Sequence, residues 1–298
     1  MCDFRVPEQL AVPVRGGDLA VLHWPAESPG APVVVLVHGI TGNGLSWARV
    51  AAGLGTDIEV FAPDLRGRAG SAGLPRPFGM DAHAEDVLAL LDAVGAPQAV
   101  LTGHSMGGFV VAVAAAGVAR DRVRGLVLVD GGLPLRDPPG ADLQAKLAGV
   151  LGPALDRLSL TFPDLAAVRA FWAQHPAVGP WVDVPSVAAY LARDVVPAAG
   201  GLRSACVPEA VTVDGGEFLT LERVYAATQN LPVRATLLWA PRGLLDQTPG
   251  LYDEQALAAP ERSGLVVRLV PDSNHYSILW AEQGVAAIRE AVRAAALG

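Results

Sequence analysis

The sequence predicts an α/β fold, in which a mostly parallel central sheet carries helices on both faces and is interrupted by an inserted, mainly helical segment. Two observations predict it. Short β-branched runs alternate with amphipathic helical stretches at both ends of the chain, and such alternation builds a parallel sheet that is covered on both sides. The alternation stops in between. We therefore expect a core formed by residues 1–132 and 231–298, with 133–230 inserted into it.

The first part of the chain begins with a hairpin. Residues 9–15 and 18–24 flank Gly16-Gly17, a typical turn between two strands. The run Val33 to Val37 is continuously β-branched or aliphatic, as expected of a strand buried on both faces. Further strands are expected at 57–61, 99–101 and 123–129, and helices at 45–54, 81–94 and 106–119.

The middle of the chain loses this regularity and the end regains it. Residues 133–230 contain many prolines and scattered helical stretches. The large aromatics of this segment are Phe162, Phe171, Trp172, Trp181, Tyr190 and Tyr225. Strands are expected again at 233–240 and 265–270, followed by an Ala-rich helix at 281–296. The simplest interpretation is one sheet with a single insertion.

Composition restricts the class of partner. Of 298 residues, 51% are hydrophobic and 17% charged, so the chain can bury a sizeable core. The formal net charge is −8, and Lys and Arg gather nowhere, which disfavours binding to nucleic acid or to anionic lipid. We expect an enzyme or binder of small molecules. The sequence does not indicate an oligomeric state.

Cysteine use and the apolar runs suggest a compartment. Two cysteines, Cys2 and Cys206, make no disulfide framework in a chain of this length, which favours a reducing environment. The first residues lack the basic and apolar regions of a signal peptide. The most apolar run, 107–119, is shorter than the roughly 20 residues of a bilayer span. These features predict a cytoplasmic protein without a membrane span.

The strongest chemical signal is Gly103-His104-Ser105-Met106-Gly107. It follows the predicted strand at 99–101 and precedes a predicted helix, and this context gives a Gly-x-Ser-x-Gly pattern its meaning. A sharp turn there exposes the Ser105 hydroxyl as a candidate nucleophile. It also leaves the Met106 N–H, at the start of the helix, free to bind an anion. An ordinary glycine-rich turn is the alternative, which the strand–turn–helix context disfavours.

A second signal, His38-Gly39-Ile40, directly follows the strand at 33–37. With it the chain resembles the α/β-hydrolase fold superfamily, and in particular a serine esterase or lipase-like member with a helical cap. The matching segments are His38-Gly39, Pro63-Asp64-Leu65-Arg66-Gly67, the turn around Ser105, Val129-Asp130 and Asn274-His275-Tyr276. The resemblance implies that the Ile40 N–H joins that of Met106 in an oxyanion hole, that His38 is structural, and that 133–230 forms the cap.

A serine hydroxyl needs a base to become a good nucleophile. His275 lies in a loop after the last predicted strand, and it follows the serine and the candidate acids in the chain order expected of this fold. We therefore expect His275 to be the general base. The other histidines are placed less well, on an early strand, on a helix, in the insertion or beside the serine itself.

Two aspartates could support that histidine. Asp246 follows the predicted strand at 233–240 by a short loop and resembles the usual acid of the family, so it is the preferred assignment. Asp130 ends the strand at 123–129, where some members carry the acid, and it remains the alternative. Asp272 is too near His275 in sequence to support it easily. Whichever residue serves would fix the imidazole tautomer.

Other ligands are not indicated. The sequence has no His-Glu-x-x-His or Cys-x-x-Cys pattern and no phosphate-cradling loop, and the glycines of 39–44 lack dinucleotide-binding spacing, so we expect neither metal nor cofactor. Candidate substrate contacts are Trp172, Trp181 and Tyr276.

The function expected from the resemblance is hydrolysis of a small to medium, mostly apolar carboxylic ester through an acyl-enzyme. Carbon–carbon bond hydrolases, thioesterases, lactonases and cofactor-free haloperoxidases share the same triad and stay open. Family members with an aspartate nucleophile are disfavoured because residue 105 is serine. A non-catalytic ligand-binding protein on the same scaffold is the alternative from another class.

Overall fold

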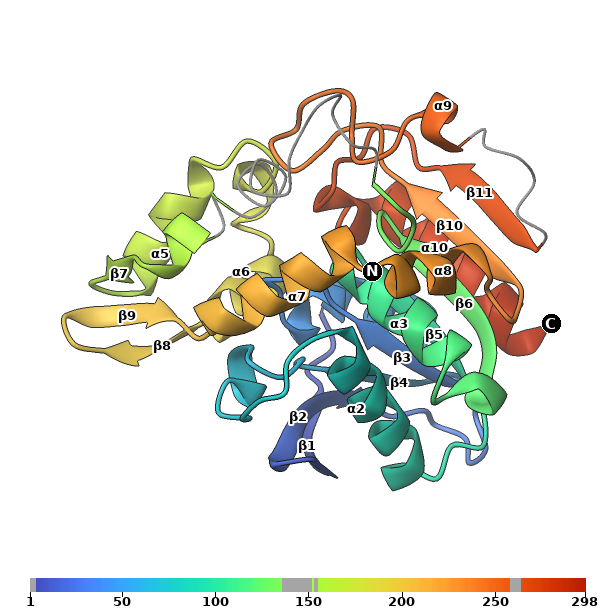
Figure 1. Cartoon of the computed structure of the whole chain (residues 1–298). Coiled ribbons are helices and arrows are strands. Elements are labelled where there is room, and N and C mark those ends of the chain that lie inside the picture. The colour runs from blue at the N-terminus through green and yellow to red at the C-terminus, as the bar shows by residue number, and fades with distance from the viewer. Residues whose placement is uncertain (1–3, 136–151, 153–154, 258–263) are drawn as a thin grey trace.

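The computed structural model describes residues 4–135, 152, 155–257 and 264–298 (Figure 1). Cys2 and the first residues of the chain, on which part of the localisation argument rests, lie outside the described residues. Within the described part, no helix is long and apolar enough to cross a bilayer.

An eight-stranded sheet organises the molecule, in the order β1-β2-β4-β3-β5-β6-β10-β11. In chain order the strands are β1 Glu8–Val14, β2 Gly17–Trp24, β3 Val33–Val37, β4 Glu59–Pro63, β5 Ala99–His104, β6 Val123–Val129, β10 Ala235–Trp239 and β11 Leu265–Leu269. The β1–β2 hairpin and the β2–β4 pair are antiparallel, and the remaining pairs are parallel. The predicted mostly parallel α/β sheet is confirmed.

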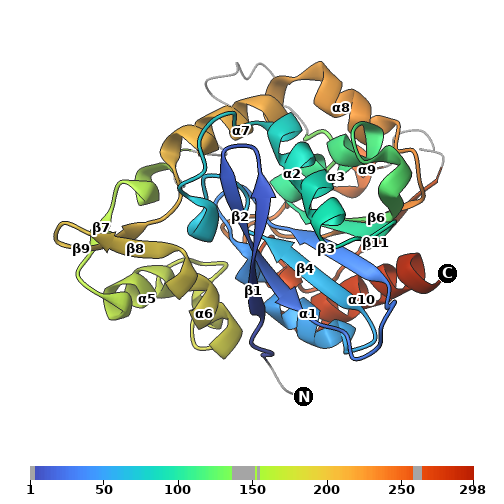
Figure 2. The ribbon, with the colours of Figure 1, turned by 90° about the horizontal axis from the view of Figure 1, so that it is seen from below.

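Helices cover both faces of this sheet (Figure 2). One face is covered by α1 (Ala48–Leu54) and α10 (Glu282–Leu297), and the other by α2 (Met80–Ala93), α3 (Met106–Ala116) and α8 (Glu222–Gln229). Strand β3 is apolar throughout because both of its faces are buried. Val35 and Val37 belong to the core on the α2–α3 side, whereas Val34 and Leu36 belong to the core on the α1–α10 side.

The segment between β6 and β10 is more than a set of helices. Its elements are β7 Thr161–Phe162, α5 Leu165–Ala173, α6 Pro185–Arg193, β8 Val195–Ala198, β9 Gly201–Ser204, α7 Pro208–Thr220 and α8. The strands form a small antiparallel sheet, β7-β9-β8, which the expectation of a mainly helical insertion did not include. Gly200 in the turn between β8 and β9, and Gly201 at the start of β9, both have positive φ, so a glycine pair marks this hairpin too.

Part of this segment packs on the main sheet rather than standing apart from it. Phe218 and Leu219 of α7 and Val224 of α8 belong to the same hydrophobic core as α3. By contrast, β7 to β9 and α5 lie to one side of the molecule, and α7 runs from them back across it (Figure 1). The boundaries at 133 and 230 remain a prediction.

The shorter elements complete the fold. They are α9 Glu254–Leu257 and the 3₁₀ helices η1 Gly44–Trp47, η2 Ala69–Ser71, η3 Arg120–Arg122, η4 Gly179–Trp181 and η5 Ser277–Leu279. Since β3, β5, β6, β10 and β11 are parallel, the segments that follow them emerge at one edge of the sheet. Each candidate catalytic or oxyanion-hole residue named from the sequence follows the end of one of these strands.

Candidate active site

Ser105 occupies the sharp turn between β5 and α3. Its backbone has φ 55° and ψ −124°, a strained conformation for a residue with a side chain. Neighbouring glycines make the turn possible, because a Cβ at Gly103 would lie 2.1 Å from the Gly107 carbonyl oxygen, and one at Gly107 would lie 2.2 Å from that of Val37. The Ser105 N–H donates to the Val129 carbonyl over 3.0 Å, which ties the turn to β6. The strand–turn–helix geometry expected for Gly-x-Ser-x-Gly is present.

His275 lies in the segment after β11 and is joined to Asp130. The distance from His275 Nδ1 to Asp130 Oδ2 is 2.6 Å, and the two residues are 3% and 0% exposed. Because a carboxylate only accepts, the proton is on Nδ1, and in the neutral imidazole Nε2 keeps its lone pair. The second oxygen of Asp130 accepts from the Ala240 N–H over 3.1 Å, so the carboxylate is fixed on both sides.

The preferred acid, Asp246, is not the partner of His275. Its carboxylate accepts from Asn274 Nδ2 over 2.8 Å and lies 3.2 Å from Arg242 Nε, with a side chain that is 33% exposed. The loop after β10 folds back on itself, since the Gly243 N–H donates to the Gln247 carbonyl and Leu245 N–H to the Gln247 side chain. This loop holds Asp246 outward, whereas Asp130 lies beneath the imidazole. The contacts of His275 therefore favour the alternative acid, Asp130, over Asp246.

Ile40 lies in the loop that follows β3, against the serine turn. A Cβ at Gly39 would lie 3.1 Å from Ser105 Cβ, a tight contact that glycine avoids. His38 shapes the loop. Its Nδ1–H donates to the Gly39 carbonyl over 2.7 Å, and its Nε2 accepts from the Leu65 N–H over 2.9 Å. Burial, with the bond to Gly39 opposing it, lowers the pKa of His38 to about 3, so the ring is neutral and structural.

The two amides expected to form an oxyanion hole are unengaged. Neither the Ile40 N–H nor the Met106 N–H has an acceptor among the described residues. Both residues line the same pocket as Ser105 and His275. Met106 is the first residue of α3, where the N–H groups point outward and the helix dipole favours a negative charge. The arrangement can accommodate a developing anion beside the serine.

A second imidazole supports the histidine loop. The Nε2–H of His104 donates to the His275 carbonyl over 2.8 Å, and the two rings lie 4.6 Å apart between centroids. Burial first, and then the proximity of His275, lower the pKa of His104 well below its usual range, so the ring is neutral. From the sequence, His104 is a poor candidate base because it lies next to the serine in a tight turn, where neighbouring side chains point in different directions. Its place inside the nucleophile pentapeptide is the signal that marks it.

The pocket around Ser105 is mainly apolar. Its described lining includes no Asp, Glu, Lys or Arg. The aromatic and aliphatic wall comprises Leu135, Phe109, Phe218, Tyr190, Leu244, Leu251, Tyr276, Leu279 and Trp280. Phe109 of α3 and Phe218 of α7 meet with ring centroids 5.1 Å apart. Such a wall excludes water and suits an uncharged ligand.

Of the three predicted substrate contacts, one lines this pocket. Tyr276 does, directly after His275. Trp172 and Trp181 are not part of the described lining. Trp172 lies under the Arg157 guanidinium, which is 5.1 Å from its ring centroid, and Trp181 packs against Trp280. Substrate contact by these two tryptophans therefore stays a prediction that the described lining does not support. The aromatics of the lining that the sequence did not single out as substrate contacts are Phe109, Tyr190, Phe218 and Trp280.

The Pro63–Gly67 segment braces the surrounding loops. Asp64 accepts from the Gly44 N–H over 2.8 Å and from Arg193 of α6. Arg66 holds Asp86 of α2 with two hydrogen bonds of 2.7 and 2.6 Å. Both carboxylates are buried and paired, a structural arrangement. In the described parts of the chain, no three His, Cys, Asp or Glu side chains are grouped so as to hold a metal ion.

Ser105 and His275 line one pocket, but their side chains are not hydrogen-bonded to each other. Catalytic hydrogen bonds are often long before substrate binds and tighten in the complex. The arrangement thus offers a hydroxyl, an imidazole oriented by a buried carboxylate and two free amides at one apolar site.

Comparison with known proteins places the chain among relatives of several named activities. Lipase LipV of Mycobacterium tuberculosis is 35% identical over 164 residues, which is 55% of this chain and 57% of the lipase. Epoxide hydrolase A of the same organism is 39% identical over 111 residues, or 35% and 33% of the two chains. The chain thus spans about three fifths of the lipase and one third of the epoxide hydrolase.

Solved structures match over nearly the whole chain. E-2-(acetamidomethylene)succinate hydrolase superposes with a TM-score of 0.74 at 22% identity, covering 96% of this chain and 99% of that one. A thioesterase domain from the curacin biosynthetic pathway gives 0.73 at 22% identity, with 97% and 99% covered. At such identities the likeness shows the fold alone. The family model described as "alpha/beta hydrolase fold" matches residues 32–241, and the chain therefore belongs to that family.

Proposed function

We propose that this protein is a serine hydrolase that cleaves a small to medium, uncharged and mostly apolar carboxylic ester through an acyl-enzyme. The observation that carries the proposal is the buried His275–Asp130 pair, which shares one apolar pocket with the strained Ser105 and two free amides. Strain at a hydroxyl that gains no packing from it favours chemistry over structure.

The chemistry follows from the contacts. As Ser105 Oγ attacks the ester carbonyl, His275 Nε2 accepts its proton, and Asp130 stabilises the resulting imidazolium at Nδ1. The negative oxygen of the tetrahedral intermediate lies against the Ile40 and Met106 amides. His275 then protonates the departing alcohol. A water molecule, deprotonated by the same imidazole, attacks the acyl-enzyme and releases the acid.

Two features support the choice of substrate. The described lining carries no charged side chain, and a buried charge without a partner is costly, so a neutral acyl group fits best. The relatives are named a lipase, an epoxide hydrolase and an N-formylmaleamate deformylase, so hydrolysis recurs while the bond varies. Serine at position 105 favours acyl transfer.

Thioesters, lactones and carbon–carbon bonds next to a carbonyl remain alternative substrates within the same mechanism. The proposal also includes a helical cap over the site.

We expect a fluorophosphonate probe to label the wild-type protein and to leave Ser105→Ala unlabelled, because only an activated serine attacks phosphorus at a useful rate. Ser46→Ala is the matched control, since Ser46 lines the same pocket outside the strained turn, and it should keep the label. Labelling is read by in-gel fluorescence and by the mass of the intact protein.

A substrate panel then separates the reaction classes. We expect p-nitrophenyl esters of short to medium chains to be cleaved faster than matched thioesters, lactones or a vinylogous diketone. An unlabelled wild type that binds but does not cleave any of these would instead identify a ligand-binding protein on this scaffold.

A further inference from the structure

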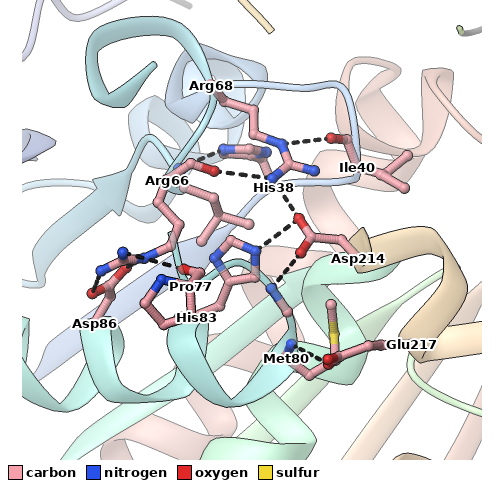
Figure 3. Close-up of polar contacts among 12 residues, drawn as sticks. His38, Ile40, Arg66, Arg68, Pro77, Met80, His83, Asp86, Asp214 and Glu217 are labelled. Atoms are coloured by element: carbon pink, nitrogen blue, oxygen red, sulfur yellow. Dashed lines mark hydrogen bonds and ion pairs between the residues drawn. The ribbon is translucent and has the colours of Figure 1, made fainter. Parts of the chain in front are cut away.

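A buried ionic cluster lies behind the Ile40 loop, outside the proposed triad. Arg68, His83 and Asp214 are each 0% exposed and come from three separate parts of the chain (Figure 3). Buried charges carry a large desolvation cost unless each is paired. None of the three lines the pocket, so direct contact with substrate does not explain the cluster.

Arg68 connects this cluster to the expected oxyanion hole. Its Nε–H donates to the Ile40 carbonyl over 2.9 Å, its Nη1 donates to the Arg66 carbonyl over 2.9 Å, and Nη1 also pairs with the Asp214 carboxylate. The guanidinium is planar, so these bonds fix one orientation of the group. The peptide between Ile40 and Thr41, which follows the Ile40 N–H, is thereby held at its carbonyl oxygen (Figure 3).

Asp214 anchors Arg68 to helix α7 and to the start of α2. One of its oxygens accepts from the Gly79 N–H over 2.7 Å, and the other accepts from His83 Nε2 over 2.9 Å and from Arg68. Burial alone would raise the pKa of Asp214, but the charges of His83 and Arg68 outweigh it and hold that pKa well below its usual range. The carboxylate is therefore ionised at neutral pH.

The neighbouring turn of α7 reinforces the link. Glu217 accepts from the Met80 N–H over 2.8 Å, so two carboxylates of α7 satisfy N–H groups at the N-terminus of α2. The next residue, Phe218, lines the pocket. One helix thus supplies a wall of the pocket and the anchor of Arg68.

We propose that Arg68 and Asp214 form a positioning pair, which holds the peptide between Ile40 and Thr41 and thereby fixes the Ile40 backbone, so that the Ile40 N–H in the preceding peptide faces the developing oxyanion, and which ties that amide to α7. The inference rests on the proposed serine hydrolase function. Neither residue touches substrate; both act through the orientation of one amide. An amide that is displaced by about 1 Å loses much of its effect on the transition state while ground-state binding is little changed.

The chain contains a matched control. Arg66 and Asp86 form a second buried, doubly hydrogen-bonded pair two residues away, and Arg66 also donates to the carbonyls of Pro75 and Pro77. Its side chain makes no hydrogen bond to the Ile40 loop. Removing either arginine should destabilise the fold to a similar degree. Only the removal of Arg68 should change the orientation of the Ile40 N–H.

The test compares Arg68→Met with Arg66→Met at a temperature where circular dichroism shows both to be folded. We expect Arg68→Met to lower kcat for a p-nitrophenyl ester about 10- to 100-fold with KM within about threefold. The affinity for a trifluoromethyl ketone, whose adduct places an oxyanion in the hole, should fall by about the same factor as kcat/KM. Arg66→Met should change kcat and ketone affinity by no more than about threefold.

Arg68→Lys and Asp214→Asn cover the case in which Arg68→Met does not fold. Lysine keeps the charge beside Asp214 but lacks the fork that reaches the Ile40 carbonyl, so it should give the same pattern of kcat and ketone affinity. Asp214→Asn should lower kcat through its effect on Arg68. The double variant with both Arg68→Lys and Asp214→Asn should therefore have a kcat no lower than that of Arg68→Lys alone.

The possible outcomes distinguish a failure of the positioning pair from a failure of the proposed serine hydrolase function. A wild type that neither hydrolyses esters nor forms the ketone adduct overturns the proposed function. A competent wild type with equal kcat and ketone affinity in the Arg68 and Arg66 variants overturns the positioning pair alone.

Discussion

Single hydrogen bonds decide which aspartate serves the candidate base. Asp130 contacts His275 from the end of β6, and Asp246 is held by Asn274 at the end of another loop. Both positions follow strands that lie side by side, β6 and β10. The choice therefore depends on how the loop after β10 folds back, which no short motif encodes.

Exchange of each aspartate for asparagine tests this assignment. We expect Asp130→Asn to lower kcat by orders of magnitude, about 10⁴-fold, because the amide offers His275 a donor as readily as an acceptor and no longer fixes its tautomer. Asp246→Asn should stay within about threefold of wild type. Steady-state kinetics with the best ester of the panel provide the measurement, and the reverse ranking would restore Asp246.

Residue patterns predicted part of the site well for a physical reason. The turn at Ser105 needs glycines wherever backbone approaches backbone, and Gly39 relieves a tight contact between the Ile40 loop and the serine, so these approaches are visible in the sequence as glycines. The pairing of Asp130 with His275 and the position of Trp172 outside the described pocket lining correspond to no such sequence pattern. Each depends on which way a loop or helix turns relative to segments far away in the chain.

At the level of elements, helix α7 has an unexpected role. It was expected within an inserted cap, and its Phe218 packs against Phe109 in the core while lining the pocket. The sheet β7-β9-β8 was missed because its strands are only two to four residues long, too short for a period-two pattern to emerge. The long, buried strands of the main sheet carry that signal clearly.

Phe218→Leu tests the place of α7 at the pocket. The smaller side chain opens space opposite Ser105, so the ratio of kcat/KM for a medium-chain ester over acetate should rise about tenfold, as expected for one or two additional methylenes. Phe171→Leu is the control, because Phe171 packs against Phe162 and is not part of the described lining. An equal shift in both variants would remove Phe218 from the substrate wall.

Across the whole molecule, two buried neutral histidines couple stability to pH. His38 and His104 bind protons more weakly in the folded state than in the unfolded chain, because burial lowers both pKa values. The unfolded state therefore takes up protons below the ordinary histidine pKa of 6.5, and the free energy of unfolding falls as the pH drops from there toward about 3.

Urea unfolding measured at pH 7 and at pH 5 tests this coupling. His38 alone should account for a loss of about 2 kcal/mol between the two, since each pH unit below its unfolded pKa costs about 1.4 kcal/mol. His38→Asn, which cannot take up a proton, should start less stable and show a flatter dependence. Equal unfolding midpoints for the wild type at both pH values would contradict the coupling.

The bond between His275 and Asp130 joins residues that are 145 positions apart in the chain, and the bond from His104 to the His275 carbonyl spans 171. A nascent chain that has not yet reached residue 275 therefore carries the candidate nucleophile without its candidate base. Under the proposed function, esterase activity regained during refolding should return no earlier than the contact between the segment after β11 and Asp130.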